Sequence, residues 1–94
     1  MASTVEISQT TTLPVDQIRS SVDKVFDELK QKYTLVGEWK NDKLFVISGE
    51  QIIGRLEIVE RSVEVTITLG WMLSAFSKMI ESQVQETLRN HLAP

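Results

Sequence analysis

The sequence lacks cysteine altogether, and this absence removes several kinds of site at once. Without a thiol there is no disulfide framework, no thiolate nucleophile and no zinc site built on sulfur. Long hydrophobic runs are also missing, since none approaches the ~20 apolar residues that cross a bilayer. The first ten residues, MASTVEISQT, lack the basic and apolar regions of a secretory signal. These absences predict a cytoplasmic protein with no transmembrane segment.

A surplus of positive charge is absent as well. The chain has 10 basic and 13 acidic residues, a net charge of −3, and the two signs alternate in both halves. Binding to nucleic acid requires a basic stripe that neutralises phosphates. The best local groups, Lys30 with Lys32 and Lys40 with Lys43, are each diluted by nearby acids. We therefore expect no nucleic-acid partner, and no attraction to an anionic membrane.

Length limits the remaining possibilities. A chain of 94 residues buries only roughly 60–65% of the surface that its unfolded form exposes. This is enough for one core, but it leaves little room for a deep active-site cleft. With 41% apolar and 24% charged residues, the composition is that of an ordinary globular protein. We predict a single domain over residues 1–94.

The spacing of the apolar residues changes along the chain. Strict alternation is typical of half-buried strands, and apolar residues three and four apart are typical of one helical face. Alternation covers residues 4–9, 35–40, 43–49, 51–59 and 62–70, and helical spacing covers residues 12–33 and 74–92. The helices must bury their apolar faces against the inner face of the sheet. The prediction is an α+β fold of order β-α-β-β-β-β-α, a mainly antiparallel sheet with two amphipathic helices packed on one face.

The turns predict which residues share a face of the sheet. A hairpin about Asn41-Asp42 would set Trp39 opposite Leu44. The second hairpin pairs Ile58 with Val63, Leu56 with Val65, Gly54 with Ile67 and Ile52 with Leu69, all on one face. A three-residue loop over residues 49–51 continues that face into the first hairpin, whereas a two-residue loop would invert it.

This register leaves large apolar side chains on the outer face, away from both helices. They are Val36, Phe45, Ile47 and Ile53. A contiguous exposed apolar patch usually marks a partner surface. We therefore predict that the outer face mediates self-association, as a homo-oligomer such as a dimer, or binding of another partner.

Trp71, Met72 and Leu73 stand where a short polar turn would be usual, between the last strand and the last helix. Two interpretations stay open. The three side chains could turn the corner and fill the gap between the sheet and the helix. Alternatively, they could form an apolar tip that docks on a hydrophobic surface. The free energy gained by burying the three side chains would exceed the cost of association by only ~2 kcal/mol.

Residues with catalytic potential form no recognisable site. His91 has no cysteine or carboxylate three or four residues away that would support metal binding. Glu57 and Glu64 are expected opposite each other, where a solvated charged ladder with Arg55 is the simpler interpretation. No Ser-His-acid arrangement and no glycine-rich phosphate loop is present. We predict no enzyme activity, no metal and no cofactor.

The sequence resembles a known family over nearly its whole length. The resemblance is carried by Gly54-Arg55 with the alternating LEI, the strand end Leu69-Gly70, the aromatic-aliphatic WML with Ser74, and the long closing helix. In these features the chain is similar to the polyhydroxyalkanoic acid system proteins, small bacterial proteins linked to polyester granules. The resemblance implies a role in polyhydroxyalkanoate synthesis or use, or at the granule surface, with no catalytic residues to carry over.

Two departures refine that expectation. Ala75 stands where many relatives have proline, and the chain lacks the long Ala/Lys-rich helices of phasins, the better-known granule coat proteins. An accessory role is therefore favoured over direct coating: a non-enzymatic, granule-associated protein whose partners are the granule surface or granule proteins. The alternative is a small protein that binds acyl or hydroxyacyl chains between the sheet and the C-terminal helix.

Overall fold

The computed structural model describes residues 3–32 and 34–92. They form five strands and two α-helices in the order β-α-β-β-β-β-α, with a short 3-10 helix before the last helix. The elements are β1 (Ser3–Thr10), α1 (Val15–Lys32), β2 (Leu35–Asn41), β3 (Leu44–Gly49), β4 (Ile52–Val59), β5 (Ser62–Leu69), η1 (Ser74–Phe76) and α2 (Ser77–Leu92). The predicted fold class is confirmed.

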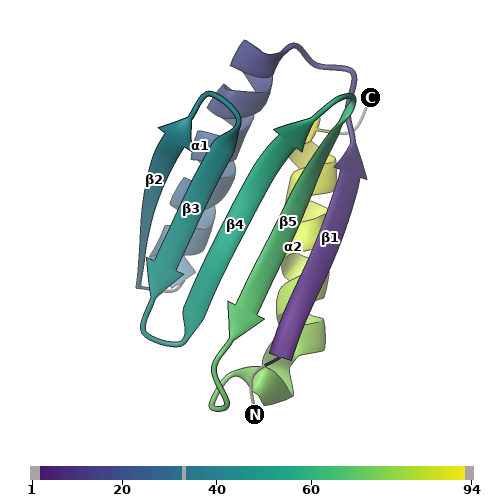
Figure 1. Cartoon of the computed structure of the whole chain (residues 1–94). Coiled ribbons are helices and arrows are strands. Elements are labelled where there is room, and N and C mark those ends of the chain that lie inside the picture. Colours follow the sequence, from purple (N-terminus) through teal and green to yellow (C-terminus); the bar gives the residue numbers. More distant parts are fainter. Residues whose placement is uncertain (1–2, 33, 93–94) are drawn as a thin grey trace.

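The strands form one antiparallel sheet in the order β1-β5-β4-β3-β2, with both helices on the same face (Figure 1). The first strand therefore lies beside the last one, and β1 and β2 are the two edges. α1 runs behind β2 and β3, and α2 runs behind β5 and β1 (Figure 1). This arrangement gives the molecule a helical layer and an outer sheet face.

The core lies between the sheet and the helices. Its most deeply buried members come from α2, β5 and α1: Leu88, Leu92, Leu69, Val63 and Val22. Burial alternates strictly along β4 and β5, and it recurs every four residues along α2 at Ile80, Val84, Leu88 and Leu92. These are the periods of a strand and of a helix with one buried face, which is why the two spacings could be recognised in the sequence.

The β4–β5 hairpin has the predicted register. Ile58 pairs with Val63, Leu56 with Val65, Gly54 with Ile67 and Ile52 with Leu69. The turn consists of Glu60 and Arg61, and Arg61 adopts a positive φ of 62°. Its carbonyl accepts a hydrogen bond of 3.0 Å from the backbone N–H of Thr11, so the turn is tied to the end of β1.

The predicted register of the β2–β3 hairpin is wrong. Trp39 pairs with Phe45 rather than Leu44, and Asn41 pairs with Leu44, which leaves Lys40 as an extra residue in a β-bulge. The turn lies one position later than predicted. The cause is the side chain of Asn41, whose Oδ1 accepts a hydrogen bond of 2.8 Å from the Lys43 backbone N–H.

The loop between β3 and β4 also differs from the prediction. Gly49 ends β3 and Ile52 begins β4, so two residues, Glu50 and Gln51, connect them instead of three. This inverts β3 relative to the predicted faces. Phe45 and Ile47 therefore point toward the helices, and Phe45 is only 4% exposed.

The predicted outer-face patch of Val36, Phe45, Ile47 and Ile53 is consequently wrong in its composition. Phe45 lies under α1, with its ring 5.2 Å from that of Phe26 in an edge-to-face contact. Ile47 packs partly buried against the core. Val36 and Ile53 do lie on the outer face and are 69% and 63% exposed, so half of the predicted patch remains there.

Candidate functional site: an apolar end of the sheet

Large exposed apolar side chains gather at one end of the described molecule. They are Val36, Ile53, Trp71, Met72, Phe76 and Met79. Val36 and Ile53 lie near the start of β2 and β4, and the other four follow the end of β5, so all six belong to the lower end in Figure 1. We call this set the apolar end.

A short hydrogen-bonded segment holds Trp71 and Met72 outward. The Gly70 N–H donates to the Gln51 carbonyl at 2.8 Å, and the Leu73 N–H donates to the Gly70 carbonyl at 3.0 Å. The Ser74 hydroxyl donates to the Trp71 carbonyl at 2.9 Å. These bonds close a turn over residues 70–74 that joins the β3–β4 loop to the start of the last helices.

Trp71, Met72 and Leu73 do not share one environment in the structure. Trp71 is 70% and Met72 58% exposed, as expected for an apolar tip. Leu73 packs partly buried against the core, as expected for a residue that fills the corner. Each open interpretation therefore describes part of the segment, and a role of Trp71 and Met72 in binding stays a prediction.

Gly70 allows this turn to approach the neighbouring loop. A Cβ built at Gly70 would collide with the side-chain amide of Gln51. Gln51 and its neighbours Glu50 and Ile52 line two hollows, one on each side of the β3–β4 loop. A side chain at position 70 would therefore require the Gln51 side chain to move.

The larger hollow is a groove of about 430 Å³ inside the apolar end. Its lining consists of Thr34, Leu35, Glu50, Gln51, Ile52, Met72, Leu73 and Phe76. The smaller hollow, of about 180 Å³, extends from the same loop to Ile53 and Thr68 on the outer face. The groove is therefore flanked by Met72 and Phe76 on the helix side, and Ile53 lies across the loop from it.

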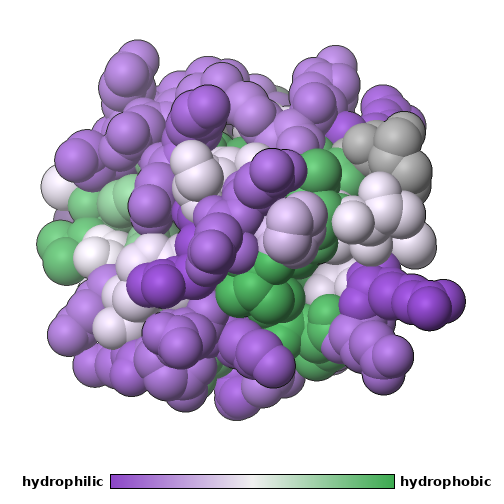
Figure 2. Space-filling view, turned by 90° about the horizontal axis from the view of Figure 1, so that it is seen from above, coloured by the Kyte–Doolittle hydropathy of each residue, from purple (hydrophilic) through white to green (hydrophobic). Residues whose placement is uncertain are grey.

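The opposite end has a different character. Figure 2 shows the molecule from above, where polar side chains dominate and apolar atoms appear in limited areas between them. None of the six exposed side chains of the apolar end belongs to the turns at this upper end. The described molecule is therefore polarised along its strands.

Phe76 and Met79 belong to the site but were not among the predicted site residues. Phe76 lies four residues before Ile80, so the helical spacing of residues 74–92 would place it on the buried face of the closing helix, yet it is 49% exposed. The reason is position: Phe76 lies in η1, one turn beyond the region where α2 rests on the sheet. An apolar residue at the very start of a predicted helix, next to an apolar turn, was the available signal.

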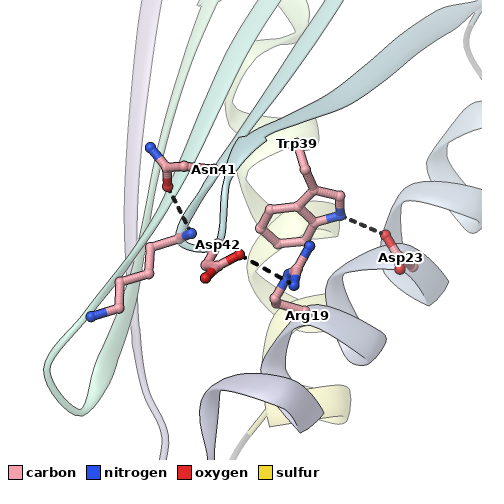
Figure 3. A network of polar contacts seen from close by, with 6 residues as sticks. Arg19, Asp23, Trp39, Asn41 and Asp42 are labelled. Carbon is pink, nitrogen blue, oxygen red and sulfur yellow. Dashed lines mark hydrogen bonds and ion pairs between the residues drawn. The ribbon is translucent and has the colours of Figure 1, made fainter.

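A polar cluster joins α1 to the β2–β3 hairpin at the other end, and it could not be predicted from the sequence (Figure 3). The Trp39 indole N–H donates to Asp23 at 3.0 Å, and the Arg19 guanidinium lies 4.8 Å from the centre of the Trp39 ring. Arg19 also approaches Asp42 at 3.7 Å. These contacts tie α1 to the hairpin and favour a structural clamp, although the buried Nε of Arg19 has no hydrogen-bond partner.

The outer face has a shallow polar concavity of about 590 Å³ over β1, β4 and β5. Glu57 and Glu64 lie opposite each other in it, as predicted. Arg55 approaches Glu57 along the same strand at 3.9 Å, rather than Glu64 across the diagonal. Within residues 3–32 and 34–92, no group of three metal-binding side chains comes together.

His91 takes part in a contact between the helices. Its Nε2 lies 3.4 Å from Glu28 of α1.

Neither of the described helices is long and apolar enough to cross a membrane.

Two small apolar cavities lie deeper, between the helices and the sheet. Each has a volume of about 30 Å³. One is lined in part by Leu35 and Ile52, which also line the groove, and the two cavities share Leu29, Ile47, Ile67 and Val84. Apolar side chains thus continue without interruption from the groove into the core.

Comparison with known proteins identifies the family. No curated protein and no solved structure was found that matches the chain. A sequence model of one protein family matches residues 5–92, which is nearly the whole chain. The chain therefore belongs to the family described as putative polyhydroxyalkanoic acid system proteins.

Proposed function

We propose that the chain is a non-enzymatic accessory protein of the polyhydroxyalkanoate system, which associates with the granule surface or its proteins through the apolar end. The observation that supports this proposal is the gathering of six large exposed apolar side chains at one end of the sheet. The family provides the polyester context. A polyester surface is itself largely apolar, so it is the kind of surface that such an end would contact.

The magnitude of the expected binding follows from the exposed area. The six side chains are between 49% and 70% exposed, so burying what remains yields roughly 1 kcal/mol each. The total of about 6 kcal/mol exceeds the lost rigid-body freedom, which costs at least ~4 kcal/mol. We therefore expect weak, reversible attachment of one copy, which several copies or a protein partner would strengthen.

The outer face alone gives less support than the sequence suggested. Phe45 and Ile47 are covered by the helical layer, and only Val36 and Ile53 remain exposed there. Their positions next to the β3–β4 loop make them the margin of the apolar end rather than a separate patch.

The test is sedimentation of the purified protein with isolated polyhydroxyalkanoate granules. Trp71→Ser with Met72→Ser is expected to weaken binding roughly thirtyfold, a loss of about 2 kcal/mol. Lys43→Ser with Glu60→Ser, at exposed positions in the turns of the opposite end, is the matched control and is expected to leave binding unchanged. In cells, a fluorescent fusion that spreads evenly despite abundant granules would contradict the proposal.

A second candidate function is the binding of an acyl or hydroxyacyl chain. The observation that favours it is that the groove and the two apolar cavities between the helices and the sheet share lining side chains. Cavities of about 30 Å³ are far smaller than ordinary ligand pockets of roughly 300–1,000 Å³, so α1 and α2 would have to separate. Native mass spectrometry without co-purified lipid, together with no thermal shift on adding acyl ligands, would reject this candidate.

A further inference from the structure

We propose that two copies of this chain join through the free edge of β1, in antiparallel orientation, so that their sheets become continuous. This inference goes beyond the proposed function and does not depend on granule binding. It concerns the edge at the right of Figure 1, where β1 has β5 on one side and, among the described residues, no strand on the other.

The two edges of the sheet differ in how they are protected. β2 contains a bulge at Lys40, and Lys40 forms an ion pair of 3.0 Å with Glu38. Bulges and lysines are common means of blocking edge-to-edge pairing. β1 pairs with β5 over Ser3–Thr10 without a register shift, and it contains no lysine, arginine or proline. The edge of β1 is therefore straight and open to a further strand.

One hydrogen bond fixes which backbone groups point to the free side. The Thr11 N–H donates to the Arg61 carbonyl, and Thr11 continues the β1–β5 register by one step beyond Thr10 and Ser62. In an antiparallel ladder the backbone groups of alternate residues point to the same neighbour. The odd-numbered residues of β1 thus face β5, and the outward groups belong to Thr4, Glu6, Ser8 and Thr10.

Only one two-fold register pairs all four outward residues. It sets Thr4 opposite Thr10 of the second copy and Glu6 opposite Ser8, with the two-fold axis at Ile7. Shifting by one step in one direction sets the two Glu6 carboxylates opposite each other, which is unfavourable. A shift in the other direction leaves Thr4 unpaired. The Thr10 carbonyl already accepts a bond of 2.9 Å from Gln9, and a carbonyl can accept a second.

The charges on α2 are compatible with this register. α2 lies behind β1 and runs in the same direction, over a similar length (Figure 1). His91 marks the flank of α2 that faces α1, so exposed Glu81, Gln85 and Arg89 lie on the opposite flank. A two-fold axis level with Ile7 passes near the middle of α2. It would bring Glu81 of each copy close to Arg89 of the other.

The test is the mass of the purified protein in solution, by size exclusion with light scattering and without granules. We expect twice the chain mass of 10.7 kDa at high micromolar concentration. A wild-type protein that stays monomeric there would overturn the proposal. Because no granule is involved, failure here would leave the proposed function standing, and the reverse also holds.

Matched charge variants test the register. Thr4→Glu with Thr10→Glu sets like charges opposite each other twice and is expected to weaken dimerisation roughly tenfold. Thr4→Lys with Thr10→Glu sets opposite charges there and is expected to preserve or strengthen it. Within one chain the directly opposite residues, Thr68 and Ser62, are uncharged, and the free energy of unfolding of both variants is measured to correct for the different effect of position 4 on Glu6. Equal dimerisation of the two double variants would overturn the register.

Cross-linking gives an independent readout, since the chain has no cysteine of its own. Opposed residues of a hydrogen-bonded pair have Cα atoms about 5.5 Å apart, a separation that suits a disulfide. A mixture of Thr4→Cys and Thr10→Cys proteins should cross-link under mild oxidation. Cross-linking of either protein alone to the same extent would contradict the proposed pairing.

Discussion

Two glycines on the inner face of the sheet occupy the same row, yet their surroundings differ. Gly37 and Gly54 both pair with Ile47, one from each side. A Cβ at Gly37 would come 2.5 Å from Phe45 Cζ and 2.8 Å from Phe26 Cζ. A Cβ at Gly54 would meet Ile47 at 3.4 Å, an ordinary contact, beside one of the small cavities.

We predict opposite effects of alanine at these two positions. Gly37→Ala should lower the free energy of unfolding by about 1–3 kcal/mol, because the Phe26–Phe45 pair must move. Gly54→Ala should raise it by about 0.5 kcal/mol, because alanine loses less backbone entropy on folding. Urea denaturation measures both, and each variant is the control for the other. Equal losses of unfolding free energy in the two variants would mean that the space beside Gly54 is as tight as the space beside Gly37.

Arg61 offers a second prediction at the scale of one residue. Its φ of 62° lies in the left-handed region, which costs a non-glycine residue roughly 1 kcal/mol. Arg61→Gly should therefore raise the free energy of unfolding by about 0.5–1 kcal/mol, while Arg61→Val should lower it. Thermal unfolding of the two variants measures the difference. An Arg61→Val variant as stable as the wild type would contradict the conformational cost assigned to this position.

Among the elements, the two hairpins explain how much of the fold could be predicted. In β5 one face is apolar and the other polar, and Arg55 with Glu57 marks the outer face of β4, so the pattern alone predicted the register correctly. In β3, Leu44 and Val46 are as apolar as Phe45 and Ile47, so either face could have been the inner one. The two-residue β3–β4 loop decides which face of β3 is the inner one, and the hydrogen bond of Asn41 with the bulge at Lys40 sets the β2–β3 register. The loop length, the hydrogen bond and the bulge cannot be recognised from the spacing of the apolar residues.

The connection between α1 and the β2–β3 hairpin is testable as a unit. Trp39→Phe removes the indole donor to Asp23 and should cost about 1 kcal/mol, and Asp23→Ala should cost a similar amount. Because both changes remove the same bond, the double variant should cost about 0.5–1 kcal/mol less than the sum. Denaturant unfolding of all four proteins measures this coupling, and strict additivity would show that the bond contributes nothing.

At the scale of the whole molecule, we expect the side chains of the apolar end to contribute more to binding than to the stability of the fold. Trp71, Met72 and Phe76 are 70%, 58% and 49% exposed, so replacing all three by serine should lower the free energy of unfolding by roughly 2 kcal/mol, less than the truncation of one fully buried large side chain costs. The same change should strongly reduce native-state fluorescence of an apolar dye. A large loss of stability would instead mean that these side chains belong to the core.

The candidate site was only partly accessible from the sequence. Trp71 and Met72 stood out because large apolar residues occupied a turn, and both are exposed. Phe45 and Ile47 were misplaced because a single loop length inverts a whole strand. Phe76 and Met79 join the site through the place where α2 leaves the sheet, which depends on tertiary packing.

The position of β1 beside β5 has a consequence for how the chain is made. Ser3 pairs with Leu69, so the first strand leaves the ribosome long before its neighbour exists. Closing so long a loop is slow and entropically costly. During synthesis β1 remains unpaired on both sides until β5 has been made. A nascent chain halted before β5 would therefore expose both edges of β1 to chaperones, whereas the finished chain exposes one.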